Sequence, residues 1–505
     1  MLRRRLSLAV ALIVFCASLV LLFTSSRAGD LLGIVGLYAT APRTSPVVDP
    51  VLIDLEVRTF RFFWDTANPK NGLIPDRYPT PSYASIAAVG FALTAYGVGV
   101  ERGYVTRKDA RKRVLATLRF LRNAPQGDAA KGMAGYKGFF YHFLDMKTGQ
   151  RFEESELSTV DTAILLAGAL FCQSYFDGSH PEEVEIRRLV DEIYRRVDWQ
   201  WAQPRAPAIN LGWSPEEGFL EYDWRGYNEA MMVYLLALGS PTHPVGPEAW
   251  TEWTSTYDTM SWRTAYGQEF LNFGPLIGHQ YTHVWIDFRK VQDAYMRRRG
   301  LDYFENTRRA VYAQQAYAIA NPHKCKAYGA TVWGLTASDG PADLTVGEGT
   351  AARLFRTYAA RGAGQVSGYD DCTLAPTAVV GSLPFAPELV IPAVLDMHKR
   401  FGQHIYAQYG FLDSFNLNFD YDIPVRHGHC IPGFGWVDGD YLGIDQGAIL
   451  AMIENYRSAM IWDVMRKNPY LRQGMVLAGF EGGWLTASAA IMPAWPVFRS
   501  SPTSH

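Results

Sequence analysis

Two kinds of helical segment alternate along the sequence, and this alternation restricts the possible fold more than any other feature. Segments 87–100, 163–171 and 230–238 are apolar on nearly every side, which is typical of helices buried all round. Segments 107–123 and 182–197 are amphipathic and charged, which is typical of helices that cover a core. We therefore predict an all-α fold in which an outer ring of helices surrounds an inner ring, an α/α toroid.

The chain divides into a short leader, a linker and one long helical region. Residues 29–48 are rich in Gly, Pro, Ser and Thr and read as a linker. Helical periodicity then continues from 49 to 482 with few alternating runs that would indicate strands. We predict one catalytic domain over 49–482 and a C-terminal tail over 483–505.

The leader indicates export. Three arginines precede an apolar run over residues 6–23, the pattern of a secretory signal. The run is also nearly as long as the roughly 20 residues that a membrane span needs. Residues 1–28 are therefore either a cleaved signal peptide or a signal anchor. We expect a periplasmic protein, or one attached through residues 6–23 to the outer side of the inner membrane.

The composition limits which kinds of substrate or binding partner we expect. A net charge of −2 gives no reason to expect nucleic acid. The 14 Trp, 28 Tyr and 27 Phe fit either dense core packing or a substrate with flat apolar faces, such as a sugar. Cys172 lies in an apolar run and is predicted to be core, whereas Cys325, Cys372 and Cys430 could include one disulfide.

Carboxylates recur where buried helices are predicted to start. Glu156 and Asp161 precede one such helix, Glu229 another and Asp445 a third, while Asp339 lies in a turn. If the inner helices run parallel, their N-terminal ends converge and these side chains share a cavity.

Two of these acids also have a structural interpretation. Asn228 is placed to cap a helix that begins at Glu229, and Gly239 is placed to end it. Ser158 and Asp161 have the spacing of a capping box. Capping and substrate contact remain open for Asp161.

Two carboxylates across a cavity with aromatic walls suit the cleavage of a glycosidic bond. For any single aromatic candidate, packing in the core is the alternative interpretation, whereas Glu156 precedes the helix cap and is not needed by it. The candidate substrate-binding residues are Asp161, Trp213, Tyr222, Trp224, Tyr227, Trp285, Asp287, Arg289, Trp333, Asp339 and Asp445.

Metal and cofactor chemistry is not predicted. His279 and His283 lie four residues apart, and His427 and His429 lie close to Cys430, but neither group has an HExxH motif. No phosphate loop, dinucleotide fingerprint or GxSxG elbow occurs in a fitting context. We expect no metal and no cofactor.

Eight motifs, in order, resemble those of the bacterial glucoamylase-like domain family over residues 58 to 463, nearly the whole mature chain. They are FFWDTANPKNGLIPDR, SIAAVGFALTAYGVGVERG, AGYKGFFYHFLD, ELSTVDTAILLAG, YNEAMMVYLLALGSPTHP, WGLTASDGP, YGFLDSFN and YLGIDQGAILAMIENYRS. The chain has GAIL where the family pattern has GPIL, a difference that does not bear on chemistry.

The resemblance implies an (α/α)6 barrel and a glycoside hydrolase acting on a β-linked glucan, with β-1,2-glucan as the first expectation. It implies that Glu156, Glu229 and Asp413 line the catalytic cleft. Glu229 is expected to be the proton donor, and Glu156 or Asp413 the base or nucleophile. A glucan transglycosylase or cyclising enzyme, and a non-catalytic glucan-binding protein, are the alternatives. A lyase acting on uronic acids would share the toroid but would need a more basic site.

Overall fold

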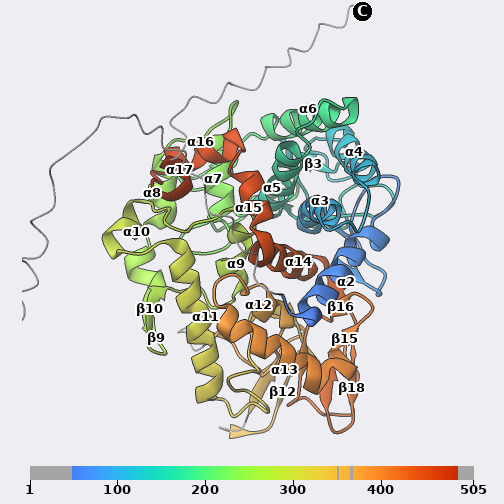
Figure 1. The fold of residues 1–505 in the computed structure, drawn as a ribbon, viewed down its shortest axis with the longest axis vertical. Helices are drawn as coiled ribbons and strands as arrows, with labels where there is room; N and C mark the ends of the chain where they lie inside the picture. The colour runs from blue at the N-terminus through green and yellow to red at the C-terminus, as the bar shows by residue number, and fades with distance from the viewer. Residues whose placement is uncertain (1–47, 350–351, 364–367, 487–505) are drawn as a thin grey trace, which may run out of the picture. The chain divides into compact units, whose positions relative to one another are not determined.

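The computed structural model describes residues 48–349, 352–363 and 368–486. The predicted signal segment, nearly all of the linker and most of the tail lie outside these residues. Within the described part of the chain, no helix is long and apolar enough to cross a membrane. The described chain is rich in helices, with sixteen α-helices, α2 to α17 (Figure 1).

Four helices are buried on all sides. They are α3 (Ile86–Glu101), α5 (Thr159–Tyr175), α7 (Met231–Gly239) and α14 (Gly443–Ser458). Helix α3 packs against both α5 and α14, and α5 packs against α7. This confirms the prediction that the apolar segments form interior helices.

The amphipathic segments form helices that bury only one face. They are α2 (Pro50–Thr66), α4 (Arg107–Asn123), α6 (Pro181–Arg195), α11 (Tyr303–Ala320) and α13 (Pro387–Ile405). Helices α4 and α6 pack against each other and each contacts a buried helix, α3 or α5 respectively. Ion pairs between arginines of α4 and glutamates of α6 join the outer surfaces of these two helices. The charged side chains therefore lie on the outer face, as the amphipathic pattern predicts.

Two long helical patterns are divided in the structure. The pattern over 288–320 gives α10 (Ala294–Arg299) and α11, because Gly300 adopts a left-handed φ of 66° and Asp302 caps the next helix. The pattern over 447–466 divides at Ala459, which has a φ of 60°. The remaining helices are α8 (Glu248–Thr254), the π-helix η1 (Tyr257–Ser261), α9 (Ile277–Trp285), α12 (Pro376–Val380), α15 (Met460–Met465), α16 (Pro469–Leu477) and α17 (Gly483–Thr486).

Many short strands connect the helices, and most are too short to leave a periodic pattern in the sequence. Strand β1 pairs with β20, which joins segments from the two ends of the described chain. The strands are β1 (Arg77–Tyr78), β2 (Ala84–Ser85), β3 (Gly135–Tyr136), β4 (Phe139–Phe140), β5 (Phe143–Leu144), β6 (Leu157–Ser158), β7 (Gly212–Ser214), β8 (Gly218–Phe219), β9 (Trp262–Ala265), β10 (Gln268–Leu271), β11 (Ala337–Asp339), β12 (Leu344–Val346), β13 (Arg353–Phe355), β14 (Tyr358–Ala360), β15 (Tyr406–Ala407), β16 (Gly410–Phe411), β17 (Phe415–Asn416), β18 (His429–Ile431), β19 (Gly435–Val437) and β20 (Tyr441–Leu442). All pairings are antiparallel, and the register of β11 with β14 sets Asp339 opposite Tyr358.

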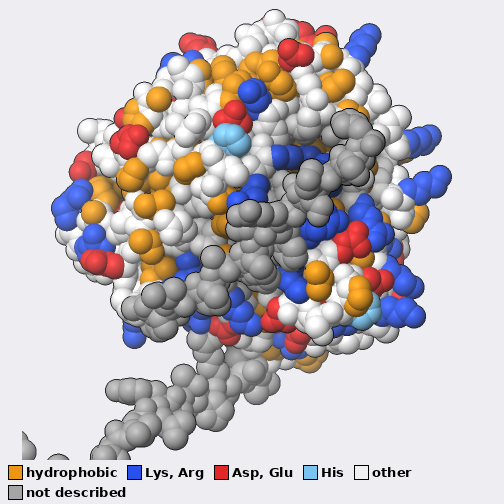
Figure 2. Space-filling view, turned by 90° about the horizontal axis from the view of Figure 1, so that it is seen from above, with side chains coloured by type: hydrophobic (Ala, Val, Ile, Leu, Met, Phe, Trp, Pro, Cys, Tyr) orange, Lys and Arg blue, Asp and Glu red, His pale blue; other side chains and the backbone are white. Residues whose placement is uncertain are grey.

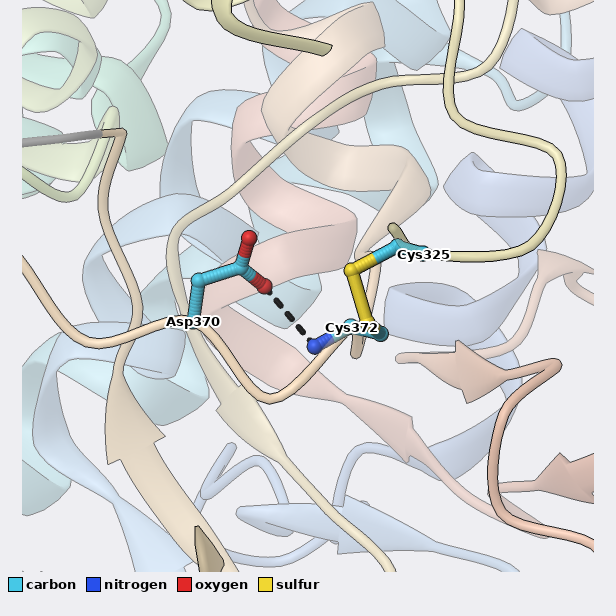
Figure 3. A group of neighbouring side chains, drawn as sticks. All are labelled: Cys325, Asp370 and Cys372. Atoms are coloured by element: carbon cyan, nitrogen blue, oxygen red, sulfur yellow. Dashed lines mark hydrogen bonds between the residues drawn. A yellow bond between two sulfur atoms is a disulfide. The ribbon is translucent and has the colours of Figure 1, made fainter. Parts of the chain in front are cut away.

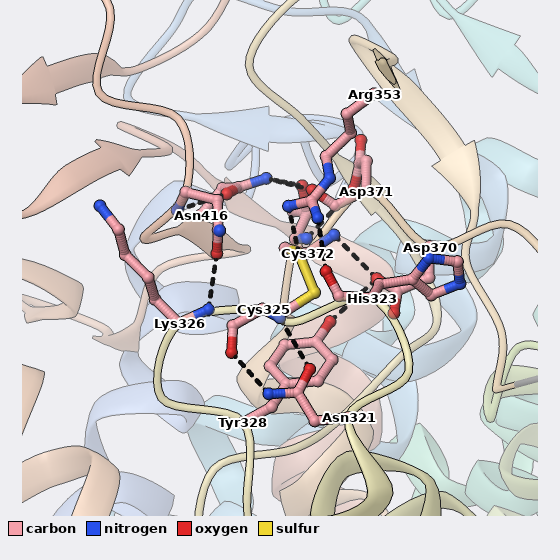
Figure 4. Close-up of a disulfide and its surroundings, with 12 residues drawn as sticks. Asn321, His323, Cys325, Lys326, Tyr328, Arg353, Asp370, Asp371, Cys372 and Asn416 are labelled. Atoms are coloured by element: carbon pink, nitrogen blue, oxygen red, sulfur yellow. Dashed lines mark hydrogen bonds between the residues drawn. A yellow bond between two sulfur atoms is a disulfide. The ribbon is translucent and has the colours of Figure 1, made fainter. Parts of the chain in front are cut away.

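One disulfide joins Cys325 to Cys372 (Figure 3). Around it, the Arg353 guanidinium donates to the backbone carbonyl of His323, and the Asp370 carboxylate accepts from the backbone N–H of Cys372 (Figure 4). Cys172 is buried, as predicted, and Cys430 is free. The disulfide thus ties the loop after α11 to the segment before α12.

The surface carries both signs of charge. On the face shown in Figure 2, basic and acidic side chains are interspersed with hydrophobic ones. This agrees with the small net charge of −2.

Candidate active site

The N-terminal ends of three buried helices meet at a cleft of about 290 Å³. Ser85 at the start of α3, Asp161 at the start of α5 and Ile444 at the start of α14 all line it. The predicted convergence of helix starts is therefore confirmed for α5 and α14, whereas the start of the third predicted helix, α7, does not line this cleft.

Glu229 lies in a turn just before α7 rather than in the helix. The helix begins at Met231, and the Asn228 side chain accepts from the backbone N–H of Ala230 at 3.0 Å. The prediction that Glu229 is the first helical residue, capped by Asn228, is therefore wrong by two residues. The Asn228 amide also donates to the carbonyl of Arg225, so its bonds hold a turn and not a helix end.

Glu229 is half-buried, and one oxygen of its carboxyl group is held away from water with no ion pair to the described residues. Its Oε2 atom is buried and accepts no hydrogen bond from the described residues. Burial, with a smaller contribution from the negative charge of Asp161, raises the pKa of Glu229 to about 6. A carboxyl group with such a pKa is suited to donate a proton near neutral pH.

Asp161 takes part in capping its helix and also lies at the cleft, where its contact with substrate stays a prediction. The Ser158 hydroxyl donates to its carboxylate at 2.5 Å and accepts its backbone N–H at 3.2 Å, which is the predicted capping box. The carboxylate also lines the cleft and lies 3.6 Å from Nε2 of His142.

His142 connects Asp161 with Glu156. Its Nδ1 atom lies 2.8 Å from Oε1 of Glu156. Burial alone would lower the pKa of His142, but the carboxylates of Asp161 and Glu156 outweigh burial and raise it to about 9. Burial likewise opposes ionisation of Glu156, but the hydrogen bond and charge of His142 hold the pKa of this carboxyl below its usual value.

Asp413 does not line the cleft, and neither do Glu156, Glu229 and Asp445. Asp413 is buried and accepts the backbone N–H of Asp339 at 2.8 Å, whereas Asp339 itself faces the cleft. Burial raises the pKa values of Asp413, Asp438 and Asp445, and their mutual proximity raises those of Asp438 and Asp445 further. Asp413 and Asp445 are therefore brought close to the cleft without contacting its contents.

Two groups of side chains have the proximity of metal ligands. Oxygen atoms of Asp339, Asp413 and Asp438 lie within 4.8 Å of one another, a donor type that hard cations prefer. The Arg77 guanidinium already donates to Asp339 at 2.5 Å and supplies positive charge there. The second group includes Cys325 and Cys372, whose sulfur atoms are joined to each other.

Several residues of this cleft were not singled out from the sequence. Asp76, Arg77 and His142 lie within motifs GLIPDR and YHFLD, which carried the family resemblance, but nothing in their spacing shows that they face one another. Burial raises the pKa of Asp76 to about 6. Tyr358, which is 52% exposed and lines the cleft, lies in a strand too irregular to predict.

Two predicted wall residues are core residues instead. Trp285 and Trp333 are each 1% exposed, so neither can stack against a sugar. The Trp285 ring packs against Phe91, and its indole N–H donates to Thr94 of α3. Tyr227 is also buried and packs beside Tyr303. The core-packing interpretation is correct for these aromatic side chains.

Asp287 and Arg289 form a structural ion pair. The Arg289 guanidinium donates to both oxygens of Asp287, at 2.8 and 2.7 Å, and lies over the ring of Trp462. Arg466 binds the same carboxylate. The prediction that this pair binds substrate is wrong, because these groups satisfy one another beyond the C-terminal end of α9 and do not line the cleft.

The other aromatic candidates lie near Glu156 without lining the 290 Å³ cleft. Trp213 is opposite Leu157 in the pairing of β6 with β7. The Trp224 indole donates to the Thr159 hydroxyl at the start of α5. Tyr222 is 67% exposed.

Both the sequence and the fold have relatives among known proteins. Residues 221–469 match the Glycoamylase family model, described as "Putative glucoamylase". A solved structure from Bacteroides uniformis, of a protein with the same description, is 30% identical, covers 86% of this chain and 98% of its own, and has a TM-score of 0.73. The chain belongs to the glucoamylase-like family.

Two relatives of this glucoamylase-like chain carry named activities. An exo β-1,2-glucooligosaccharide sophorohydrolase acting at the non-reducing end, from Parabacteroides distasonis, is 27% identical over 464 residues. The match covers 86% of this chain but only 58% of that relative. An endo-β-1,2-glucanase from Chitinophaga pinensis is 27% identical, with 86% of this chain and 99% of that chain covered and a TM-score of 0.72.

Proposed function

We propose that this chain is a glycoside hydrolase that cleaves β-1,2-linked glucan. The observation that carries the proposal is the half-buried Glu229: its Oε2 atom is buried and accepts no hydrogen bond from the described residues, and its pKa is raised to about 6 by burial and, to a smaller extent, by the charge of Asp161. The linkage is supported by the named activities of the two relatives, both of which act on β-1,2-glucans.

The scaffold of the proposal is an (α/α)6 toroid over residues 49–482. Its inner ring would include α3, α5, α7 and α14, which are buried, and its outer ring would include α2, α4, α6, α11 and α13, which bury one face. Export through residues 1–28, with residues 6–23 as signal or anchor, is part of the same proposal and follows from the sequence pattern.

In the proposed reaction, Glu229 gives its proton to the glycosidic oxygen as the bond to the leaving sugar breaks. A second carboxylate, from the pair Glu156 and Asp161, activates water or attacks the anomeric carbon. In this proposal Asp413, which is buried and accepts the backbone N–H of Asp339, is assigned a supporting role. This departs from the expectation that Asp413 is the alternative base or nucleophile.

Hydroxyl groups of the glucan have partners in the cleft. Arg77 and Asp339 form an ion pair at its wall, with Nδ1 of His427 3.1 Å from the same guanidinium. The exposed ring of Tyr358 lies opposite Asp339 in the β11–β14 pairing and offers an apolar face to a sugar. A flat polar and apolar surface of this kind suits a glucosyl unit.

The test incubates the purified protein with β-1,2-glucan, β-1,3-glucan and starch and follows reducing ends and product lengths. We expect cleavage of β-1,2-glucan and a loss of about 10²–10⁴-fold in kcat for Glu229→Gln, the range for removal of a general acid. The exposed Glu217→Gln is the matched control and should retain activity.

The products also separate the remaining alternatives. Sophorose alone would indicate exo action, and a ladder of lengths would indicate endo action. Longer or cyclic products would indicate transfer. A folded protein that cleaves none of the three glucans would overturn the proposal.

A further inference from the structure

The place of His142 is fixed by contacts of both its backbone and its ring. Its backbone N–H donates to the carbonyl of Glu156 at 2.8 Å, and its carbonyl accepts the N–H of Ile86, the first residue of α3, at 3.2 Å. Its ring stacks on that of Phe143, with 3.8 Å between centroids. The ring therefore has little freedom to turn away from the acids on either side.

Each nitrogen of the ring faces a different carboxylate. Nδ1 lies 2.8 Å from Glu156, and Nε2 lies 3.6 Å from Asp161. A neutral imidazole has one N–H and would turn a lone pair towards one of the two acids. The imidazolium form has two N–H groups and presents positive charge to both acids, so it fits the geometry better than the neutral form does.

We propose that His142 is a positioning residue: as an imidazolium it bridges Glu156 and Asp161, favours the charged form of Glu156, and thereby leaves Glu229 as the proton donor. The inference deepens the proposed function and rests on it for its catalytic part. The bridge itself is a structural claim that does not depend on the substrate.

The charges around His142 favour this form. Glu156 precedes β6, Asp161 lies in the first turn of α5, and Asp76 precedes β1; all three attract a proton to the ring. The nearby Arg77 is paired with Asp339, while Arg426 and His427 also line the cleft. Burial lowers the pKa of His427, so Arg77 and Arg426 are the cations among these three groups, and the carboxylates beside the ring outweigh them.

The consequence is a division of labour among similar side chains. Glu156 receives a hydrogen bond from a cation, which stabilises its charged form. Glu229 receives none and is desolvated, which stabilises its neutral form. Two carboxyl groups whose environments separate their pKa values are suited to act as base and acid in one reaction.

The first test measures the bridge without using activity. Histidines carrying ¹³C at Cε1 would be titrated by NMR in the full chain, with the His142 resonance assigned by its loss in His142→Asn. We expect a pKa near 9 for His142 in the wild-type chain. In Glu156→Gln this pKa should fall by at least about one unit, because one ionic partner is removed. The exposed Glu154→Gln should leave it unchanged. A His142 pKa near 6.5, or a pKa that does not change in Glu156→Gln, would overturn the bridge.

The second test asks whether the bridge sets the catalytic roles. In His142→Asn the amide can still donate near the position of Nδ1–H, but the positive charge is lost. We expect the acid limb of the kcat/KM profile to move up by about one pH unit or more, and the alkaline limb, set by Glu229, to move less. A merely structural loss would lower the rate by the same factor at every pH and would overturn the positioning role.

The two tests separate the two claims. If the wild-type protein cleaves no glucan, the proposed function fails, while the NMR titration still decides whether His142 is a charged bridge. His142→Gln, which keeps an amide but moves it towards the position of Nε2, provides a second variant should His142→Asn fold poorly. Melting curves of both variants establish that the measured profiles belong to folded protein.

Discussion

The crossing of α3 and α5 allows a sharp prediction, because the two backbones touch where neither helix has a side chain. A Cβ atom added at Gly168 would lie 1.9 Å from the carbonyl oxygen of Gly90 and 2.6 Å from its carbonyl carbon. Neither helix can yield by turning a side chain, since the atoms in contact are main-chain atoms. Gly168→Ala must therefore push the helices apart.

The magnitude follows from two opposing terms. Replacing Gly with Ala inside a helix normally stabilises by about 1 kcal/mol. Overpacking a close-packed interior costs about 1–3 kcal/mol, and a backbone clash belongs at the upper end. The expected net destabilisation is about 2 kcal/mol, the difference between a cost near 3 and a gain near 1.

The assay compares urea unfolding of Gly168→Ala with that of Gly402→Ala. Gly402 lies in α13, where the nearest atom to an added Cβ is 3.6 Å away, so the same substitution should stabilise by up to about 1 kcal/mol. The two variants should move the midpoint in opposite directions. Equal stability of the two variants would refute the argument that backbone contact at Gly168 sets the α3–α5 spacing.

Two further predictions concern stability. Replacing Cys325 and Cys372 together by Ser opens a bridge across 47 residues, and the melting temperature should fall by an amount corresponding to about 4 kcal/mol on the chain-entropy model; an unchanged melting temperature under oxidising conditions would contradict it. Hydrogen bonds from Arg107, opposed by burial, lower the pKa of Glu183 from 4.5 to about 2, so its contribution is present above pH 4.5 and lost as the pH falls towards 2. After allowance for solvent around Arg107, Glu183→Gln should therefore destabilise the protein by about 2 kcal/mol at pH 7. The difference in urea midpoint between this variant and the wild type should shrink towards pH 2–3. A difference that stays constant with pH would contradict the linkage.

The sequence predicted the helical framework because that framework has a strong periodic signal. The segments of α3, α5 and α7 are apolar all round, and burial of such helices leaves few alternatives. The convergence of helix starts followed from the same pattern. Boundaries were less secure: the residues before α7 form a turn around Asn228 that propensity does not distinguish from a helix cap.

The cleft was less predictable because its contacts join distant segments. Arg77 reaches Asp339 across 262 positions of sequence, and no local pattern indicates that pairing. Trp285 was misassigned for a related reason: a tryptophan has the same sequence signal in a core as at a sugar site. His142 was overlooked because its neighbour Phe143 suggests an ordinary strand and nothing local indicates a site. Only the fold brings Asp161 close to its ring.

The roles of the acids depend on surroundings more than on position along the chain. Glu156 and Glu229 are the same residue type and both precede buried helices. Glu156 is hydrogen-bonded to the cationic His142, whereas Glu229 lies in a turn where its carboxyl group is desolvated. Asp413 adds a third case, in which a carboxylate accepts the backbone N–H of Asp339 and is shielded from the cleft. Removing the Asp413 carboxylate would leave the backbone N–H of Asp339 buried without its acceptor, at a cost of about 1–3 kcal/mol. Asp339, which pairs with Arg77 in the cleft wall, would then be held less firmly. A motif can therefore mark Asp413 as necessary while leaving open whether it touches substrate, and the buried contact with Asp339 gives a structural reason for its presence while its catalytic role stays a prediction.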